Sequence, residues 1–175
     1  MSRCRSISYL YRIHERNTGM TAPELRWECK SWQELSNEDQ YKIIQLRIAV
    51  FIIEQKCFYQ ELDGKDKASL HVLGRKQEGD LLAYARILPP GAAFTEPAIG
   101  RILVAAYARG CGLGAELIRK SIDYCINIFD LPALCISAQL QLRKYYENLG
   151  FIAEGNPYDE DGIDHIKMRY SRLLH

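Results

Sequence analysis

The chain is organised around residues 98–128, which read AIGRILVAAYARGCGLGAELIRKSIDYCINI. The apolar run Ala98–Val104 is typical of a strand, and apolar residues three and four apart predict a helix over 112–128. Between the two lies the loop Arg109-Gly110-Cys111-Gly112-Leu113-Gly114. Glycines let backbone N–H groups point outward, and the start of a helix adds partial positive charge. The strand, loop and helix together predict a pyrophosphate site.

A glycine-rich loop can also be a flexible turn, a Walker loop or a Rossmann loop. A Walker loop would end in Gly-Lys-Ser or Gly-Lys-Thr, which this loop lacks. The Rossmann spacing is met formally by Gly110, Gly112 and Ala115. However, the acidic Asp130 precedes the next strand, and the remaining chain is too short for a second mononucleotide-binding half. The position at a strand-to-helix junction favours phosphate binding over a plain turn.

The rest of the chain predicts one α/β domain with a mixed sheet. Alternating or continuous apolar runs predict the remaining strands at Leu25–Lys30, Leu70–Arg75, Leu81–Leu88 and Ala133–Ala138, from Phe151 onward, and at Ile166–Tyr170. Asn156-Pro157 and Asp161-Gly162 predict turns before the last strand. A helix is expected after the N-cap Ser36 and another over Leu140–Leu149. The first has an apolar stripe at Tyr41, Ile44, Ile48 and Phe51, which Ile43, Leu46 and Val50 widen. This order predicts an antiparallel first half, followed by a right-handed crossover between two parallel strands.

Composition limits the classes of function. Lys and Arg number 23 and Asp and Glu 22, so the net charge of +1 gives no global field for nucleic acid. The chain has no run of 18 apolar residues, which argues against a membrane span. Six cysteines without a Cys-x-x-Cys pair suggest reduced thiols, no metal and a cytoplasmic protein. Residues 1–24 are Arg-rich and are expected to be a flexible extension ahead of a domain over 25–175.

Two ordered motifs resemble the GNAT N-acetyltransferases. Arg109-x-x-Gly112-x-Gly114 matches the acetyl-CoA signature of that family, and Tyr145-Tyr146-x-x-x-Gly150-Phe151 matches its later aromatic motif. Similarity to the ElaA-like branch comes from three further stretches: Leu46-Arg47-x-x-Val50-Phe51-x-x-Glu54-Gln55, Asp63-Gly64-x-Asp66 and Asp161-Gly162-Ile163-x-His165-Ile166. The resemblance covers roughly residues 25 to 171 and implies a mostly antiparallel sheet with splayed parallel central strands flanked by helices.

The resemblance also implies a chemistry. Acetyl-CoA would be the co-substrate, its pyrophosphate held by residues 109–114 and its acyl end lined by Ile102, Leu103 and Val104, with a backbone N–H there as oxyanion donor. Tyr146 would serve the leaving thiolate. Gln139 stands where many relatives carry Asn. The acceptor would be an amine, either a small molecule or a protein amine, and a homodimer is left open.

The residue that removes the amine proton is predicted from chemistry. Glu54 is the first candidate because it directly follows an apolar segment, where burial can raise a carboxyl pKa. Glu61 and His71 are the alternatives. Residues 54–66 could equally form a solvated acidic loop that attracts cations. The competing function is a non-catalytic acyl-CoA sensor or interaction module; retention of Tyr146 favours the enzyme.

Overall fold

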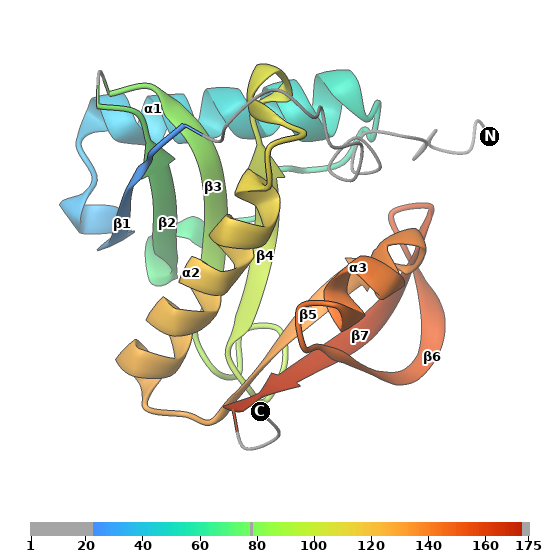
Figure 1. Cartoon of the computed structure of the whole chain (residues 1–175). Helices are drawn as coiled ribbons and strands as arrows, with labels where there is room; N and C mark the ends of the chain where they lie inside the picture. The colour runs from blue at the N-terminus through green and yellow to red at the C-terminus, as the bar shows by residue number, and fades with distance from the viewer. Residues whose placement is uncertain (1–22, 78, 173–175) are drawn as a thin grey trace.

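A computed structural model describes residues 23–77 and 79–172, so the predicted extension over 1–24 lies almost wholly outside the described residues (Figure 1). The described chain forms a seven-stranded sheet in the order β1-β2-β3-β4-β5-β7-β6. Its strands are β1 (Arg26–Ser31), β2 (Leu70–Arg75), β3 (Leu81–Leu88), β4 (Ala98–Val104), β5 (Ala133–Gln139), β6 (Ile152–Glu160) and β7 (Ile163–Ser171). Every neighbouring pair of strands is antiparallel except β4 and β5, which are parallel. The helix α2 (Leu113–Phe129) connects these two strands, which confirms the predicted crossover.

Two helices cover opposite faces of the first half of the sheet (Figure 1). Successive residues of a strand point to opposite faces, so Val72 packs on the α2 side and Leu73 on the other. On that second side lie α1 (Asn37–Arg47) and its continuation η3 (Ile48–Glu54), a π-helix. The site is therefore built on a sheet that is held from both faces.

The central parallel strands separate almost as soon as they meet. Only Ala98 and Cys135 form a register pair, closed by a hydrogen bond of 2.9 Å from Cys135 N to Pro97 O. Beyond this point β5, β7 and β6 diverge from β4 as a second leaf (Figure 1). The predicted splay is present, and it leaves an opening toward the carboxyl ends of β4 and β5.

The buried face of α1 differs from the predicted stripe. Ser36 caps the helix as expected, its Oγ accepting from Asp39 N at 3.1 Å. Ile43 and Val50 of the predicted stripe are buried, but Tyr41 is 64% exposed and Ile48 37% exposed, and Arg47 is fully buried. The prediction was therefore wrong for Tyr41 and Ile48, because the buried face is centred on Ile43, Arg47 and Val50, and apolar spacing alone assigns an arginine to the surface.

Two more local predictions need correction. The second predicted helix is shorter, since η6 (Leu140–Leu142) precedes α3 (Arg143–Glu147). The turn predicted at Asn156-Pro157 is instead a bulge within β6, where the register with β7 shifts between Glu154 and Tyr158. Because β6 is an edge strand, a proline there costs no ladder hydrogen bond.

The oxidation state of the cysteines differs from the prediction at one position. Cys29, Cys111, Cys125 and Cys135 are free thiols, whereas Cys57 is disulfide-bonded, so the expectation that all six are reduced is wrong for Cys57. Within residues 23–77 and 79–172, no helix has the length and apolarity needed to span a bilayer. The same residues hold no group of three or more side chains arranged as metal ligands.

Candidate active site

The glycine loop lies at the start of α2, directly beyond the open end of the splay. Gly110 and Gly112 have φ angles of 86° and 89°, a left-handed conformation that favours glycine. Gly112 is the N-cap of α2, and a Cβ built on it would meet nothing within 4 Å. The loop therefore presents open space in front of the N–H groups and positive dipole end of a 17-residue helix.

Arg109 anchors the beginning of this loop. Its Nη1 and Nη2 donate to the two carboxylate oxygens of Glu54 at 2.5 and 3.1 Å, and its Nε donates to Val104 O at 2.9 Å. Glu54 thus faces Arg109, and it is not among the residues that line the cleft described below. Its role as a base stays a prediction.

A cleft of about 700 Å³ opens between the two leaves of the sheet. Ile102, Gln139 and Tyr146 line it, so three residues assigned from the sequence come together there. The side chains of Leu103 and Val104 do not line it, because they are buried in the cores on opposite faces of β4.

A bulge in β4 shapes the wall of the cleft on the β4 side, which we call the near wall. Tyr84 pairs with Leu103 and Arg86 with Gly100, so two residues of β4, Arg101 and Ile102, oppose one residue of β3. Arg101 takes a φ of 51°, which is uncommon outside glycine. Both bulged residues line the cleft.

Tyr146 sits where the cleft meets the core. Its ring packs edge-on against Tyr145 and Phe151, with centroids 5.5 and 5.7 Å away. Burial is the main reason that the pKa of Tyr146 is raised above its ordinary value, with a smaller contribution from Tyr145. A phenol with a raised pKa is a weak proton donor but still a good hydrogen-bond donor.

The acidic side chains of residues 54–66 are paired within the protein, so they do not form the solvated acidic loop that their sequence allowed. Glu61 and Asp66 are 5% and 6% exposed. The fully buried Arg47 binds both, with Nε to Glu61 Oε1 at 2.8 Å and Nη1 to Asp66 Oδ1 at 2.7 Å. The interpretation failed because these acidic side chains pair with arginines that are distant in sequence.

Two more arginines extend this network to the cleft. Arg86 makes two bonds to the carboxylate of Asp63, at 2.7 and 2.6 Å, and a third to Asp66 at 2.9 Å. Arg101 donates to Glu61 Oε1 at 2.9 Å. We call these residues the arginine network; its three guanidinium groups (Arg47, Arg86, Arg101) balance its three carboxylates (Glu61, Asp63, Asp66). The charges of the arginine network are consequently balanced within the protein.

His71, an alternative base in the sequence analysis, is fully buried beneath this network. Its Nε2 donates to Asp66 O at 3.0 Å, so its Nδ1 accepts from the Tyr84 hydroxyl at 2.8 Å. Burial is the largest influence and lowers the pKa of His71. Both ring nitrogens are occupied within the protein, and His71 does not line the cleft.

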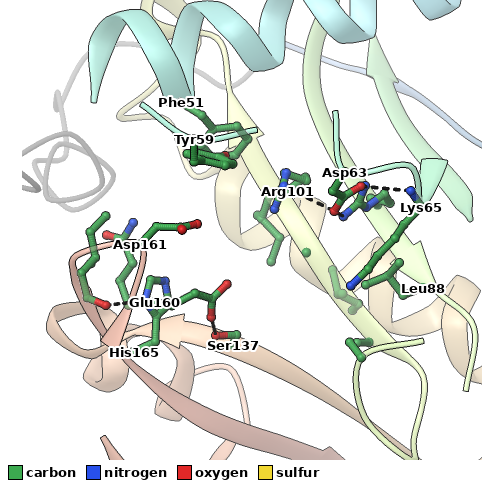
Figure 2. A pocket seen from close by; sticks show the side chains of 18 of the residues that line it. Phe51, Tyr59, Asp63, Lys65, Leu88, Arg101, Ser137, Glu160, Asp161 and His165 are labelled. Carbon is green, nitrogen blue, oxygen red and sulfur yellow. Dashed lines mark hydrogen bonds and ion pairs between the residues drawn. The ribbon is translucent and has the colours of Figure 1, made fainter. Parts of the chain in front are cut away.

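The opposite wall of the cleft, which we call the far wall, is formed by β5, β6 and β7, and the sequence did not predict a function for it. Ser137, Tyr158, Glu160 and His165 share one face of β5, β6 and β7 and line the cleft, opposite Arg101 and the Asp63 side of the near wall (Figure 2). The sequence signal was present in the alternation of Tyr158, Glu160, Ile163 and His165 around the Asp161-Gly162 turn. This pattern did not predict a functional role, because a local pattern does not show that these strands pair with β5.

Comparison with known proteins agrees with this geometry. A family model described as "Acetyltransferase (GNAT) domain" matches residues 34–172. The chain is 38% identical over 146 residues to protein ElaA of Escherichia coli, covering 82% of this chain and 95% of ElaA. The crystal structure of E. coli ElaA superposes with a TM-score of 0.78 at 36% identity, covering 85% of this chain and all of that one.

Two other solved structures share the fold. The crystal structure of an acyl-CoA N-acyltransferase from Pseudomonas aeruginosa has a TM-score of 0.80 at 38% identity, covering 85% of this chain and 100% of that chain. The structure of spermidine N-acetyltransferase from Vibrio cholerae, in complex with CoA and spermine, has a TM-score of 0.64 at 19% identity, covering 84% of this chain and 96% of that chain. At that identity the Vibrio enzyme is evidence of the fold alone.

Proposed function

The chain belongs to the acetyltransferase (GNAT) family, as an ElaA-like member, and from that premise we propose that it moves the acetyl group of acetyl-CoA to a primary amine by direct attack in a ternary complex. The observation that carries the proposal is the single register pair between β4 and β5. The cleft opened by that separation joins Ile102 and Tyr146, and the glycine loop lies beyond β4.

Acetyl-CoA would lie along the splay with its pyrophosphate on the N–H groups of residues 110–114. The open space above Gly112 and the helix dipole behind it support this placement. Glu54 and Arg109 would position the loop, because their ion pair ties the end of η3 to the start of the loop. The solved Vibrio fold-relative, which holds CoA, agrees with a CoA site in this architecture.

The reaction requires a neutral amine, a stabilised oxyanion and a stabilised leaving group. The amine nitrogen attacks the thioester carbonyl carbon, and the carbonyl electron pair moves onto oxygen. A backbone N–H of Ile102, Leu103 or Val104 is proposed as its donor. The C–S bond then breaks with loss of one amine proton, and the thiolate is released.

Tyr146 is proposed to donate a hydrogen bond to that thiolate. Ordinary pKa values of ~10 for phenol and ~8.5 for a thiol already make full proton transfer unfavourable. The raised pKa of Tyr146 makes it more so. The proposed contribution is therefore stabilisation of charge on sulfur in the transition state, with the proton for CoA supplied in the end by solvent.

Steady-state kinetics test this proposal. Acetyl-CoA would be offered with spermidine, kanamycin, an unblocked tetrapeptide and N-acetyl-lysine amide, with thiol release as the readout. We expect transfer to at least one amine, with double-reciprocal plots that intersect, because both substrates must be bound. Parallel plots would indicate a covalent acyl-enzyme and contradict direct attack. CoA binding without transfer to any amine would favour the sensor.

A further inference from the structure

We infer that His165 is the general base that accepts the proton of the incoming ammonium group, an assignment that rests on the proposed function. His165 lines the cleft from β7, and its ring is directed into the space between the walls (Figure 2). Of the two histidines in residues 23–77 and 79–172, His71 is buried with both nitrogens bonded, so His165 is the one that faces the cleft.

The register places His165 at the level where the reaction would occur. β4 and β5 touch at Ala98 and Cys135, and four residues further along are Ile102 and Gln139. Four residues of strand span about 13 Å. Gln139 pairs with His165 on β7. His165 therefore lies beside Gln139 at the open end of the splay, and it lines the same cleft as Ile102 of β4, one of the residues proposed to hold the acyl group.

The proton on the imidazole ring is fixed by the backbone. Nδ1 of His165 lies 2.9 Å from the carbonyl oxygen of Ile163. A carbonyl oxygen only accepts, so Nδ1 carries the hydrogen when the ring is neutral. The lone pair then belongs to Nε2, the nitrogen free to take a proton from substrate.

Hydrogen bonds around Ser137 hold the tyrosine ring that lies beside His165. Ser137 Oγ donates to Glu160 Oε2 at 2.5 Å and accepts from the Tyr158 hydroxyl at 2.6 Å. Tyr158 pairs with His165 across β6 and β7, and the two rings lie at 28° with centroids 6.4 Å apart. These contacts come from all three strands of the far wall, so the ring is held by the sheet itself.

The charges around His165 favour an ammonium group on its side of the cleft. Glu160 and Asp161 line the cleft beside it, from the end of β6 and the adjoining turn. Among the described residues, neither of these two carboxylates has an ion pair within 4 Å.

The facing groups of the near wall are largely paired. Asp63 with Arg86, and Arg101 with Glu61, belong to the arginine network, and Tyr59 lies over Arg101 at 5.4 Å. Lys65 also lines the cleft on the Asp63 side, and Tyr146 lines it from α3. A cationic acceptor that enters between the two walls would consequently be attracted to the carboxylates without ion pairs on the His165 side.

The proton balance is simple. Nε2 of His165 takes one proton from the ammonium nitrogen, which frees the lone pair that attacks the acetyl carbon. The imidazolium then releases its proton to water. The second nitrogen proton leaves through water as the C–S bond breaks, and the thiolate is protonated on release. No oxidant or metal is needed.

The test compares His165→Asn with the wild-type protein. Asparagine can still donate to Ile163 O but has no lone pair at the position of Nε2. With the amine of the panel that is turned over fastest, we expect kcat/KM at pH 7 to fall about 100-fold or more, because a positioned base contributes roughly 10²–10⁴. The defect should shrink as the pH approaches the amine pKa of ~10, where the acceptor arrives neutral. KM for acetyl-CoA should not change.

Glu160→Gln is the matched control. It should raise KM for the amine and leave the shape of the pH profile intact. A His165→Asn profile parallel to that of the wild type would overturn the inference while leaving the proposed function in place. Failure of the wild-type protein to acetylate any amine of the panel would overturn both.

A measurement without turnover gives an independent result. In the ¹⁵N-labelled protein above pH 8, the imidazole signals of His165, assigned by their loss in His165→Asn, should show hydrogen on Nδ1 and a bare Nε2. Hydrogen on Nε2 would overturn the inference, because that nitrogen could not then accept a proton.

Discussion

Glu54 and Arg109 are joined by two hydrogen bonds although 55 positions separate them in the chain. Their side chains are only 16% and 11% exposed, and the same guanidinium holds the carbonyl of Val104 at 2.9 Å. Three elements thus meet at Arg109: the end of η3, the end of β4 and the loop that begins α2. The predicted catalytic base is, in the structure, the partner of the first residue of the predicted CoA motif.

Glu54→Gln should therefore weaken CoA binding. We expect about a tenfold rise in the Kd of acetyl-CoA by calorimetry, because a hydrogen bond to a charged group contributes roughly 1.5–3 kcal/mol. The pH profile of kcat/KM from about pH 6 to 10 should run parallel to that of the wild type. Glu147→Gln, which removes a surface partner of Arg143, is the control and should change neither quantity. Normal CoA affinity with a defect confined to low pH would instead identify Glu54 as the base.

Gly112→Asp should abolish binding of acetyl-CoA. The new carboxylate would project into the open space over the loop and repel the pyrophosphate. The φ of 89° also adds backbone strain of about 1–2 kcal/mol for any side chain. Gly112→Ala carries the strain without the charge, so it should lose similar stability but retain measurable affinity. Equal affinities of the two variants would remove charge from the explanation.

Tyr146→Phe should lower kcat and leave KM for acetyl-CoA nearly unchanged, because the hydroxyl acts chiefly when negative charge grows on sulfur. Tyr145→Phe is the control: Tyr145 packs beside Tyr146, and burial raises its pKa to about 12. Its effect on kcat should be milder. Large KM increases in both variants would indicate that the two rings serve packing alone.

Arg47→Met should destabilise the fold by about 3–5 kcal/mol, because it leaves Glu61 and Asp66 buried without their main cation. Urea unfolding at pH 7 measures this loss. Lys42→Met removes an exposed helical ion pair with Glu38 and should cost less than about 0.5 kcal/mol. A loss near that of the control would mean that the arginine network contributes little to stability.

His71 should make the protein less stable as the pH falls below about 6.5. The unfolded chain takes up a proton there, whereas the folded protein, in which mainly burial lowers the pKa of His71, does not. The free energy of unfolding therefore decreases from about pH 6.5 down to the folded pKa, by at most about 1.4 kcal/mol per pH unit. His71→Gln can keep the bond to Asp66 O and should flatten this slope in denaturant titrations. An unchanged slope would assign the pH dependence to other groups.

Local sequence was sufficient for the crossover and the position of the glycine loop. Helical spacing from Leu113 to Cys125 and the positions of Gly110 and Gly112 depend on a few consecutive residues, so periodicity and glycine content encode them directly. The same holds for the N-cap at Ser36. These features were enough to predict the fold class, the parallel pair and the motif that places the chain in its family.

Only the tertiary structure determined the walls of the cleft. Arg47 looks like a surface residue in the helical pattern, and its burial depends on carboxylates that lie 14 and 19 positions away. His165 lies at the open end of the splay because β7 pairs with β5 in the register that sets His165 opposite Gln139. Ion pairing and strand register are long-range properties that no local window contains, so the sequence predicted the elements and the three-dimensional fold decided which of their side chains share the site.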